Sequence, residues 1–327
     1  MKQFLRSQVF FAALLLTFCR PLPSAEPTGA EFEGRPTKDA ADLQYWLGNM
    51  IAHRFSAEEV GLALNLPTTE AASLLEKART TEPTLSNSNG IVVLPYPGGR
   101  HPRIGFLEGA VRPQRETKVS VFAPWKDGGY LVVDLPEAVW HQPDGKRELL
   151  YLAHTHVPTI WDKQEVRLPL LEWNRDQRNS LSLTREFPNK VSMTSRVKGT
   201  AEGAQLEFSV TNGSAEKLTG LHIQMCGMLK GLTGFSQQTN DNKIFQSPFA
   251  ACKDQTGKRW VILGFDHCKR AWGNAPCPCL HADPQVPDCL PGETQTVHGW
   301  VSFFEGDEIA GELKRLEKIA FQPIAIP

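Results

Sequence analysis

The chain has 327 residues, of which 41% are hydrophobic and 22% are charged, and its formal net charge is −1. This length is enough to bury a sizeable core. The near-neutral charge, without a basic field, argues against a nucleic-acid partner, because phosphate binding needs clustered Lys and Arg.

The N-terminus has the layout of a secretory signal peptide. Lys2 and Arg6 form a basic region, residues 9–19 are apolar but too short to span a bilayer, and small residues precede a cut that we place after Ala25. Removing residues 1–25 leaves a net charge of about −4. No later segment is long and apolar enough to cross a membrane. We therefore expect a secreted or periplasmic protein without a transmembrane segment after signal removal.

Two short regions come before the main fold. Residues 26–37 are rich in Pro, Gly and charge and indicate a flexible leader, whereas residues 38–79 have helical spacing and predict a small helical bundle. Ser56 and Glu59 form a capping box that begins the second helix. The stretch resembles a helix-turn-helix, but export and the acidic balance argue against DNA binding, and packing or docking explains it equally well.

Residues 90–306 change to a period of two, which favours strands. About a dozen strands without intervening helices predict a large antiparallel β-sandwich, preceded by the bundle and followed by a C-terminal amphipathic helix and tail at 307–327. The apolar runs that indicate strands are 91–95, 103–107, 118–123, 130–135, 148–157, 168–173, 180–187, 191–197, 205–211, 218–228, 259–265 and 296–304.

Six cysteines follow the signal peptide, which is an even number in a chain expected to be exported. Disulfides are therefore the first interpretation, although sequence cannot choose among the possible connectivities. The alternative is a metal site with Cys277, Cys279, His281 and Cys289 as ligands, since zinc favours these atoms. The disulfide candidates are Cys226, Cys252, Cys268, Cys277, Cys279 and Cys289.

His154 and His156 are the best candidates for chemistry. They lie two residues apart on a predicted strand and therefore point to the same face. Both imidazoles could approach one divalent metal ion or one ligand. The alternative is that they bond to backbone near the end of the strand, and the sequence places no third metal ligand at a diagnostic distance.

Several other side chains suit a carbohydrate ligand. The Arg115 guanidinium pairs well with carboxylate or sulfate groups, although a structural ion pair is the alternative. Asn240 lies in a polar segment near a strand end and can bind hydroxyls. The strand region also holds seven tryptophans, on whose faces sugar rings stack, although we expect most of them to fill the core. Trp161 and Trp272 are the two that we select as ligand contacts.

No motif identifies a reaction. The chain contains no Gly-x-Ser-x-Gly and no His-Glu-x-x-His, so the common serine hydrolase and zinc protease patterns are absent. Acids such as Asp134, Glu137, Asp162 and Glu172 lie near strands, but their separations, which glycosidase chemistry would require, cannot be obtained from sequence. Whether the protein is an enzyme stays open.

Four segments carry a resemblance to a family of exported proteins from planctomycete-type bacteria. They are PYPGGRHPRIGFLEGAVRPQRETKVSVFAPW, YLAHTHVPTIW, QTNDNKIF and WGNAPCPCLHADPQVPDC. This resemblance covers most of residues 40–318 and implies no activity. In strand count and tryptophan content the chain is also similar to galactose-mutarotase-type β-sandwich domains. Such domains bind and transform sugars with His and Glu as proton carriers, which implies a sugar ligand here.

Three hypotheses follow. The first is a secreted β-sandwich that recognises, and in one version modifies, carbohydrate. The second is a metal-dependent enzyme built on His154 and His156. The third is a disulfide-stapled structural protein of the envelope, with the helical bundle as its docking arm and an envelope component as its partner.

Overall fold

The computed structural model describes residues 34–81, 90–104, 115–154, 157–175 and 179–325. The chain divides into two units, Met1–Phe32 and Glu33–Pro327, and all described residues belong to the second. The signal peptide and most of the leader predicted from the sequence lie outside them.

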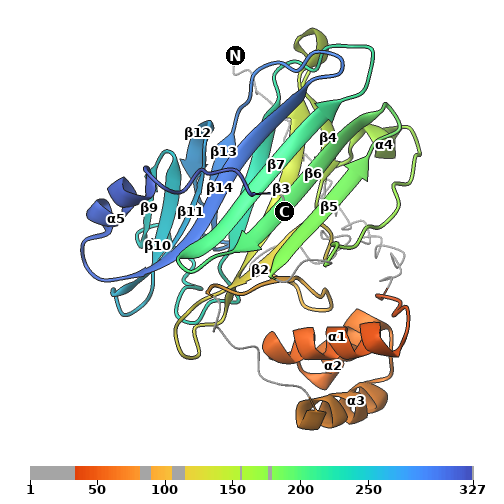
Figure 1. Ribbon diagram of the computed structural model, residues 1–327, viewed down its shortest axis with the longest axis vertical. Helices are drawn as coiled ribbons and strands as arrows, with labels where there is room; N and C mark the ends of the chain where they lie inside the picture. Colours follow the sequence, from red (N-terminus) through yellow and green to blue (C-terminus); the bar gives the residue numbers. More distant parts are fainter. Residues whose placement is uncertain (1–33, 82–89, 105–114, 155–156, 176–178, 326–327) are drawn as a thin grey trace, which may run out of the picture. The chain divides into compact units, whose positions relative to one another are not determined.

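Two seven-stranded antiparallel sheets form the body of this unit, which confirms the predicted β-sandwich (Figure 1). The first has the order β1-β2-β3-β8-β13-β12, with β4 also paired to β3, and the second has the order β5-β6-β7-β14-β11-β10-β9. The first sheet consists of β1 (Val93–Pro95), β2 (Lys118–Phe122), β3 (Tyr130–His141), β4 (Glu148–Leu152), β8 (His222–Met228), β12 (Cys268–Trp272) and β13 (Cys279–Pro284). The second consists of β5 (Ser180–Glu186), β6 (Val191–Gly199), β7 (Gly203–Asn212), β9 (Lys243–Gln246), β10 (Phe249–Lys253), β11 (Arg259–Phe265) and β14 (Thr294–Glu305).

The main core lies between the two sheets. Alternate residues of each strand point inward, so Val119 and Leu131 of the first sheet share one apolar cluster with Leu206 and Val261 of the second. The opposite side chains of each strand point to an outer face. What covers each outer face differs between the two sheets, and this difference places the candidate site.

Three helices pack against the outer face of the first sheet. They are α1 (Ala40–Ala52), α2 (Ala57–Leu64) and α3 (Thr68–Thr81), in the region where the sequence predicts a helical bundle. Asp39 caps α1, and Ser56 with Glu59 forms the predicted capping box of α2. Trp46 and Met50 of α1 share an apolar cluster with Tyr130 and Val132 of β3, so the bundle is part of the same packed unit.

The C-terminal helix α5 (Ile309–Leu316) packs on the outer face of the second sheet (Figure 1). Ile309, Leu313 and Leu316 share a cluster with Trp260 of β11 and Trp300 of β14. Two short helices complete the described elements, the 3-10 helix η1 (Pro143–Gly145) and α4 (Ile160–Lys163). No helix in the described part of the chain is long and apolar enough to cross a membrane.

The strand prediction fails in two places. The apolar run at 168–173 forms no strand, and of the run at 103–107 the described residues 103–104 form none. Conversely, β9, β10, β12 and β13 were not predicted, although β12 begins at Cys268 and β13 at Cys279. β12 and β13 form a hairpin, and β13 also pairs with β8, which joins the hairpin to the first sheet.

Candidate functional site

A row of polar side chains crosses the outer face of the first sheet. The registers place Lys118 of β2 opposite Asp134 of β3, Asp134 opposite Cys226 of β8, Cys226 opposite His281 of β13, and His281 opposite Trp272 of β12. We call these five residues the cross-strand row. All but the half-buried Trp272 are buried. Because buried charged groups are uncommon, this row is the most informative feature of the sheet.

Two cations and two carboxylates balance each other at one end of the row. Lys118 Nζ lies 2.8 Å from Asp134 Oδ1. Arg103 enters from the loop before β2, with one guanidinium nitrogen 3.3 Å from Asp134 Oδ2 and 2.5 Å from Glu137 Oε1. The same nitrogen lies 3.5 Å from Cys226 Sγ. Charges removed from water in this way persist only when paired, so the four groups depend on one another.

Glu137 connects the row to two histidines. It lies in the irregular part of β3 between Asp134 and Ala138, and its Oε1 is 2.8 Å from His154 Nε2. Its Oε2 is 3.6 Å from His281 Nδ1. Burial opposes ionisation of Glu137, but the Arg103 guanidinium and the two imidazoles outweigh burial and hold its pKa well below its usual range. Glu137 is therefore a carboxylate near pH 7.

His154 is neutral near pH 7. Burial lowers its pKa to about 4, and the nearby Arg103 and Lys118 act in the same direction against the hydrogen bond to Glu137. A neutral imidazole bonded to a carboxylate can hold or pass a proton. The structure thus places one of the predicted histidines in a cluster with acid–base character.

His281 is fixed by its neighbours at the other end of the row. The Trp272 ring stacks on it with centroids 3.9 Å apart and planes 15° apart. Trp272 Nε1 donates a 2.6 Å hydrogen bond to Asp283 Oδ2, and Asp283 Oδ1 lies 3.5 Å from His281 Nδ1. Asp283 also accepts the backbone N–H of Met225 at 3.1 Å. These contacts hold the imidazole in one orientation.

Two groups of described residues have the separations of metal ligands. One is Asp134, Glu137 and His154, and the other is Cys226, Cys279 and His281. Within each group the potential ligand atoms lie within 4.8 Å of one another. The first group is already neutralised by Arg103 and Lys118, so a metal ion there would meet two positive charges. In the second group the same Arg103 nitrogen lies 3.5 Å from Cys226 Sγ.

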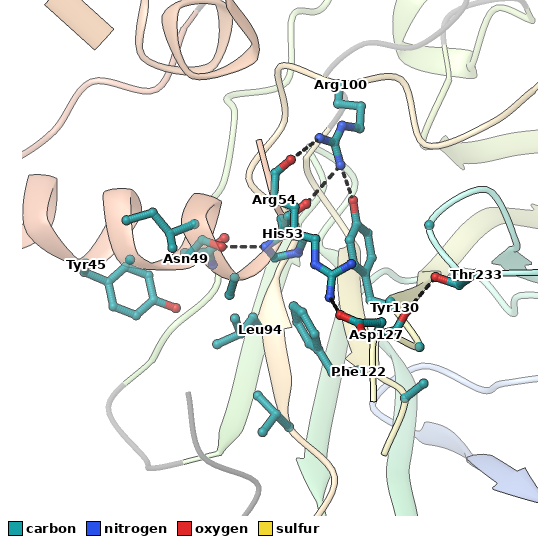
Figure 2. A pocket seen from close by; sticks show the side chains of 18 of the residues that line it. Tyr45, Asn49, His53, Arg54, Leu94, Arg100, Phe122, Asp127, Tyr130 and Thr233 are labelled. Atoms are coloured by element: carbon teal, nitrogen blue, oxygen red, sulfur yellow. Dashed lines mark hydrogen bonds and ion pairs between the residues drawn. The ribbon is translucent and has the colours of Figure 1, made fainter. Parts of the chain in front are cut away.

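A groove with a volume of about 900 Å³ opens between α1 and the same sheet. Figure 2 shows Tyr45 and Asn49 of α1 on one side and Phe122 and Tyr130 of the sheet on the other. Trp125 and Asp127 from the β2–β3 connection and Thr233 from the loop after β8 also line it. Aromatic faces with a few placed polar groups are typical of small-molecule sites.

The polar groups of the groove fall into two kinds. Arg54 and Asp127 form a 2.6 Å ion pair whose side chains are 63% and 64% exposed. Arg100, by contrast, is occupied in the wall, because it donates to the carbonyls of His53 and Arg54 and to the Tyr130 hydroxyl. Arg54 and Asp127 are therefore available to a ligand, while Arg100 shapes the groove (Figure 2).

The turn that carries Arg100 depends on glycine. Gly99 has a φ of +75°, and a Cβ there would lie 2.5 Å from the Glu59 carbonyl oxygen of α2. Only glycine allows both the left-handed backbone and this approach. Arg100 then pairs with Glu59 at 2.5 Å, which joins the turn to the helical bundle.

His53 anchors α1 to the sheet below the groove. Its Nδ1 lies 2.8 Å from the Asn49 carbonyl oxygen and its Nε2 lies 2.7 Å from Ser120 Oγ. Burial lowers its pKa to about 3, which keeps the ring neutral. The His53 side chain therefore has a structural role and supplies no charge to the groove.

The other candidates from the sequence are dispersed. Arg115 Nε bonds to Glu172 at 2.7 Å, which is the structural ion pair considered as its alternative. Trp161 is buried and donates to the Leu150 carbonyl oxygen. Asn240 is exposed and donates to the Gly273 carbonyl oxygen next to Trp272. His156 lies outside the described residues, so the paired-histidine hypothesis stays a prediction.

The predicted disulfide framework is not found. All six cysteines of the described residues carry free thiols. Cys252 and Cys289 lie in separate parts of the main core. Cys252 is on β10 of the second sheet, whereas the backbone of Cys289 forms an isolated β-bridge with that of Leu218. The alternative metal set also changes. Cys226 joins Cys279 and His281, and neither Cys277 nor Cys289 belongs to the group, because β8 and β13 are neighbours.

Sequence reasoning missed Arg103, Lys118 and the groove residues Tyr45, Arg54 and Asp127. A usable signal existed for one of them, because Lys118 begins an apolar alternation at an outward position. The groove residues gave no signal, because they come from three separate elements and meet only after folding.

The chain shows low similarity to several solved structures. These include the Slr1438 protein from Synechocystis sp. PCC 6803 (10% identity, 58% of this chain and 88% of that chain, TM-score 0.34). A galactose mutarotase related enzyme from Lactobacillus acidophilus has 10% identity, covers 61% of this chain and 98% of its own, and has a TM-score of 0.32. An aldose epimerase homologue from C. elegans has 8% identity, covers 58% of this chain and 92% of its own, and has a TM-score of 0.32. These values are too low to carry an argument about function. No protein-family model and no curated protein matches the chain.

Proposed function

We propose that the protein binds a carbohydrate in the groove between α1 and the first sheet. The observation that carries this is the lining: the aromatic rings of Tyr45, Phe122 and Tyr130 lie beside the exposed Arg54–Asp127 pair in a space of about 900 Å³. Sugars present apolar CH faces that stack on rings and hydroxyls that bond to charged and amide groups. This groove offers both kinds of contact.

The charge of the lining favours an acidic sugar. Arg54, Arg79, Arg100 and Lys230 face one acid, Asp127, among the described residues that line the groove. Arg100 forms an ion pair with Glu59, and Arg54 forms one with Asp127. The surplus of positive charge in the groove therefore comes from the exposed Arg79 and Lys230. Carboxylate or sulfate groups on the sugar would complement this surplus.

Calorimetric titration of the full-length protein with neutral and acidic oligosaccharides tests the proposal. We expect saturable binding of an acidic oligosaccharide and a matching rise in Tm, since a ligand that binds only the native state stabilises it. Arg54→Ala should weaken binding of the acidic oligosaccharide by about tenfold, or ~1.4 kcal/mol. Asp288→Ala removes another exposed ion pair, with Lys217, and serves as the matched control.

Two results would contradict this function. One is the absence of saturable binding across the whole panel at millimolar concentrations. The other is binding that Arg54→Ala leaves at the wild-type affinity. In that case an envelope component that docks on the protein becomes the better hypothesis, and a pull-down from envelope fractions would identify it.

We further propose that the protein works outside the cytoplasm. The support is the basic and apolar N-terminal segment that ends in small residues near Ala25. N-terminal sequencing of the native protein should give a chain that begins at Glu26, within a few residues. A native chain in the cytosol that retains its first residues would contradict the proposal.

A further inference from the structure

We propose that Cys226, Cys279 and His281 form a binding site for a thiophilic metal ion, with Zn²⁺ as the first choice. Each residue offers one ligand atom, the three atoms lie within 4.8 Å of one another, and all three side chains are buried. This site is separate from the groove proposed to bind carbohydrate and does not depend on that function.

The fold positions the three ligands on a rigid support. Cys279 and His281 are two residues apart on β13 and therefore project from the same face. Cys226 on β8 is the register partner of His281, so its side chain lies directly across the strand pair on that face. The ligands come from the middle of a sheet, where backbone hydrogen bonds limit their movement.

The donor set selects the class of metal. Two thiols and an imidazole are the ligands of zinc and of cuprous copper, whereas calcium and magnesium require oxygen donors. In a tetrahedral site with Zn–S bonds of about 2.3 Å, two ligand sulfurs lie about 3.8 Å apart. The observed separations, all within 4.8 Å, need only small side-chain adjustments to reach this geometry.

The surroundings of His281 support the same conclusion. Its Nδ1 is buried, with Asp283 Oδ1 3.5 Å away and Glu137 Oε2 3.6 Å away. Metal-bound imidazoles are normally oriented by a carboxylate at the ring nitrogen that does not bind the metal. Asp283 and Glu137 are the carboxylates beside this ring, and Trp272 stacks on it.

The site has three protein ligands among the described residues. Cys277 is also buried and precedes Cys279 by two residues, but it is not part of the group whose ligand atoms lie within 4.8 Å. Zinc sites with three protein ligands keep a fourth position for water or another small ligand.

Metal analysis of the full-length protein, purified without a histidine tag under reducing conditions, tests the inference. We expect one equivalent of zinc per chain, and we expect Co²⁺ in its place to produce the near-ultraviolet absorption of thiolate-to-cobalt charge transfer. Cys279→Ser and His281→Gln should lower the affinity for zinc by at least tenfold. Cys252→Ser, which removes a buried thiol from β10, should bind as the wild type does.

Circular dichroism of each variant establishes that it is folded, and the cobalt spectrum of the wild type needs no variant at all. The inference is overturned if the folded wild type takes up no stoichiometric zinc and shows no charge-transfer absorption with Co²⁺. It is also overturned if Cys279→Ser retains the wild-type affinity, or if non-reducing mass analysis finds a Cys226–Cys279 disulfide in the native protein.

Discussion

The outer faces of the two sheets are built from the same alternation but carry different chemistry. On the second sheet the outward residues Trp260 and Trp300 are sealed by Leu313 and Leu316 of α5, and the contact is apolar. On the first sheet the outward residues include Lys118, Asp134 and other ionisable groups buried under loops and helices. An apolar seal contributes stability at no cost in desolvated charge, whereas a buried polar row costs stability unless every partner is present.

The comparison teaches where function lies in this molecule. The part of the second sheet under α5 is covered by hydrophobic side chains, and the buried Glu207 elsewhere on that face is paired with Arg196. The first sheet keeps two charges, a thiol and an imidazole in register across four strands. Since such groups are expensive to bury, they mark the face on which we place both the groove and the metal site.

The largest expected effect comes from breaking the charge balance of the first sheet. Asp134→Ala leaves Lys118 and Arg103 buried without this carboxylate and should lower the free energy of unfolding by about 3–5 kcal/mol. Urea denaturation followed by fluorescence measures it. Glu202→Ala, which breaks an exposed ion pair with Arg315, should cost less than about 1 kcal/mol. A loss below about 1 kcal/mol for Asp134→Ala would show that the row is not mutually dependent.

Breaking the apolar seal should cost slightly less. Leu316→Ala removes a fully buried side chain from α5 and should lower the free energy of unfolding by about 3 kcal/mol through lost burial and a cavity. Because α5 covers the second sheet, the variant should bind carbohydrate and zinc as the wild type does, once folded. Altered ligand binding in the folded Leu316→Ala protein would contradict the division between the two faces.

The pH dependence sharpens the comparison further. Burial lowers the pKa of His53 in the folded protein to about 3, from its usual value of 6.5. As the pH falls below 6.5, His53 therefore binds a proton in the unfolded state before it does so in the folded state. Stability contributed by the neutral ring is therefore complete above pH 6.5 and declines toward pH 3, by up to about 1.4 kcal/mol per pH unit. Urea denaturation at pH 7 and pH 5 should show this slope in the wild type and a flatter one in His53→Gln. Equal slopes would exclude His53 as a source of acid sensitivity.

The smallest effect on stability belongs to the groove. Arg79→Ala and Lys230→Ala change exposed side chains and should alter the free energy of unfolding by less than about 0.5 kcal/mol. The same variants should weaken binding of an acidic oligosaccharide and leave a neutral one unaffected, as calorimetry can measure. Lys217→Ala is the matched control at an exposed lysine elsewhere. Equal weakening of neutral and acidic ligands would contradict the charge argument.

The sandwich was predictable because most strands have one buried side and one polar side. In β6, Val191, Met193 and Val197 point inward between polar residues, and this alternation survives in the sequence. The strand β13 was missed for the opposite reason. Its outward residues Cys279 and His281 are polar yet buried, and nearby prolines gave the segment the composition of a turn.

The candidate site was predictable only in part. His154 and Trp272 were selected from the sequence and lie in the cluster around the cross-strand row. The residues that they contact, Glu137 and His281, are brought to them by the pairing of the strands. Cys226 meets His281, 55 positions further along the chain, only because β8 and β13 pair. The groove depends in the same way on how α1 packs against the β2–β3 hairpin. Composition carries no information on such pairings.

Hydrogen–deuterium exchange of the full-length protein with and without a saturating acidic oligosaccharide tests the central claim most directly. The account predicts slower exchange in residues 41–54 of α1 and its C-terminal turn and in residues 122–130, which line the groove, and no change in residues 309–316 of α5. Protection confined to α5 and the second sheet, or no protection anywhere at saturation, would contradict it.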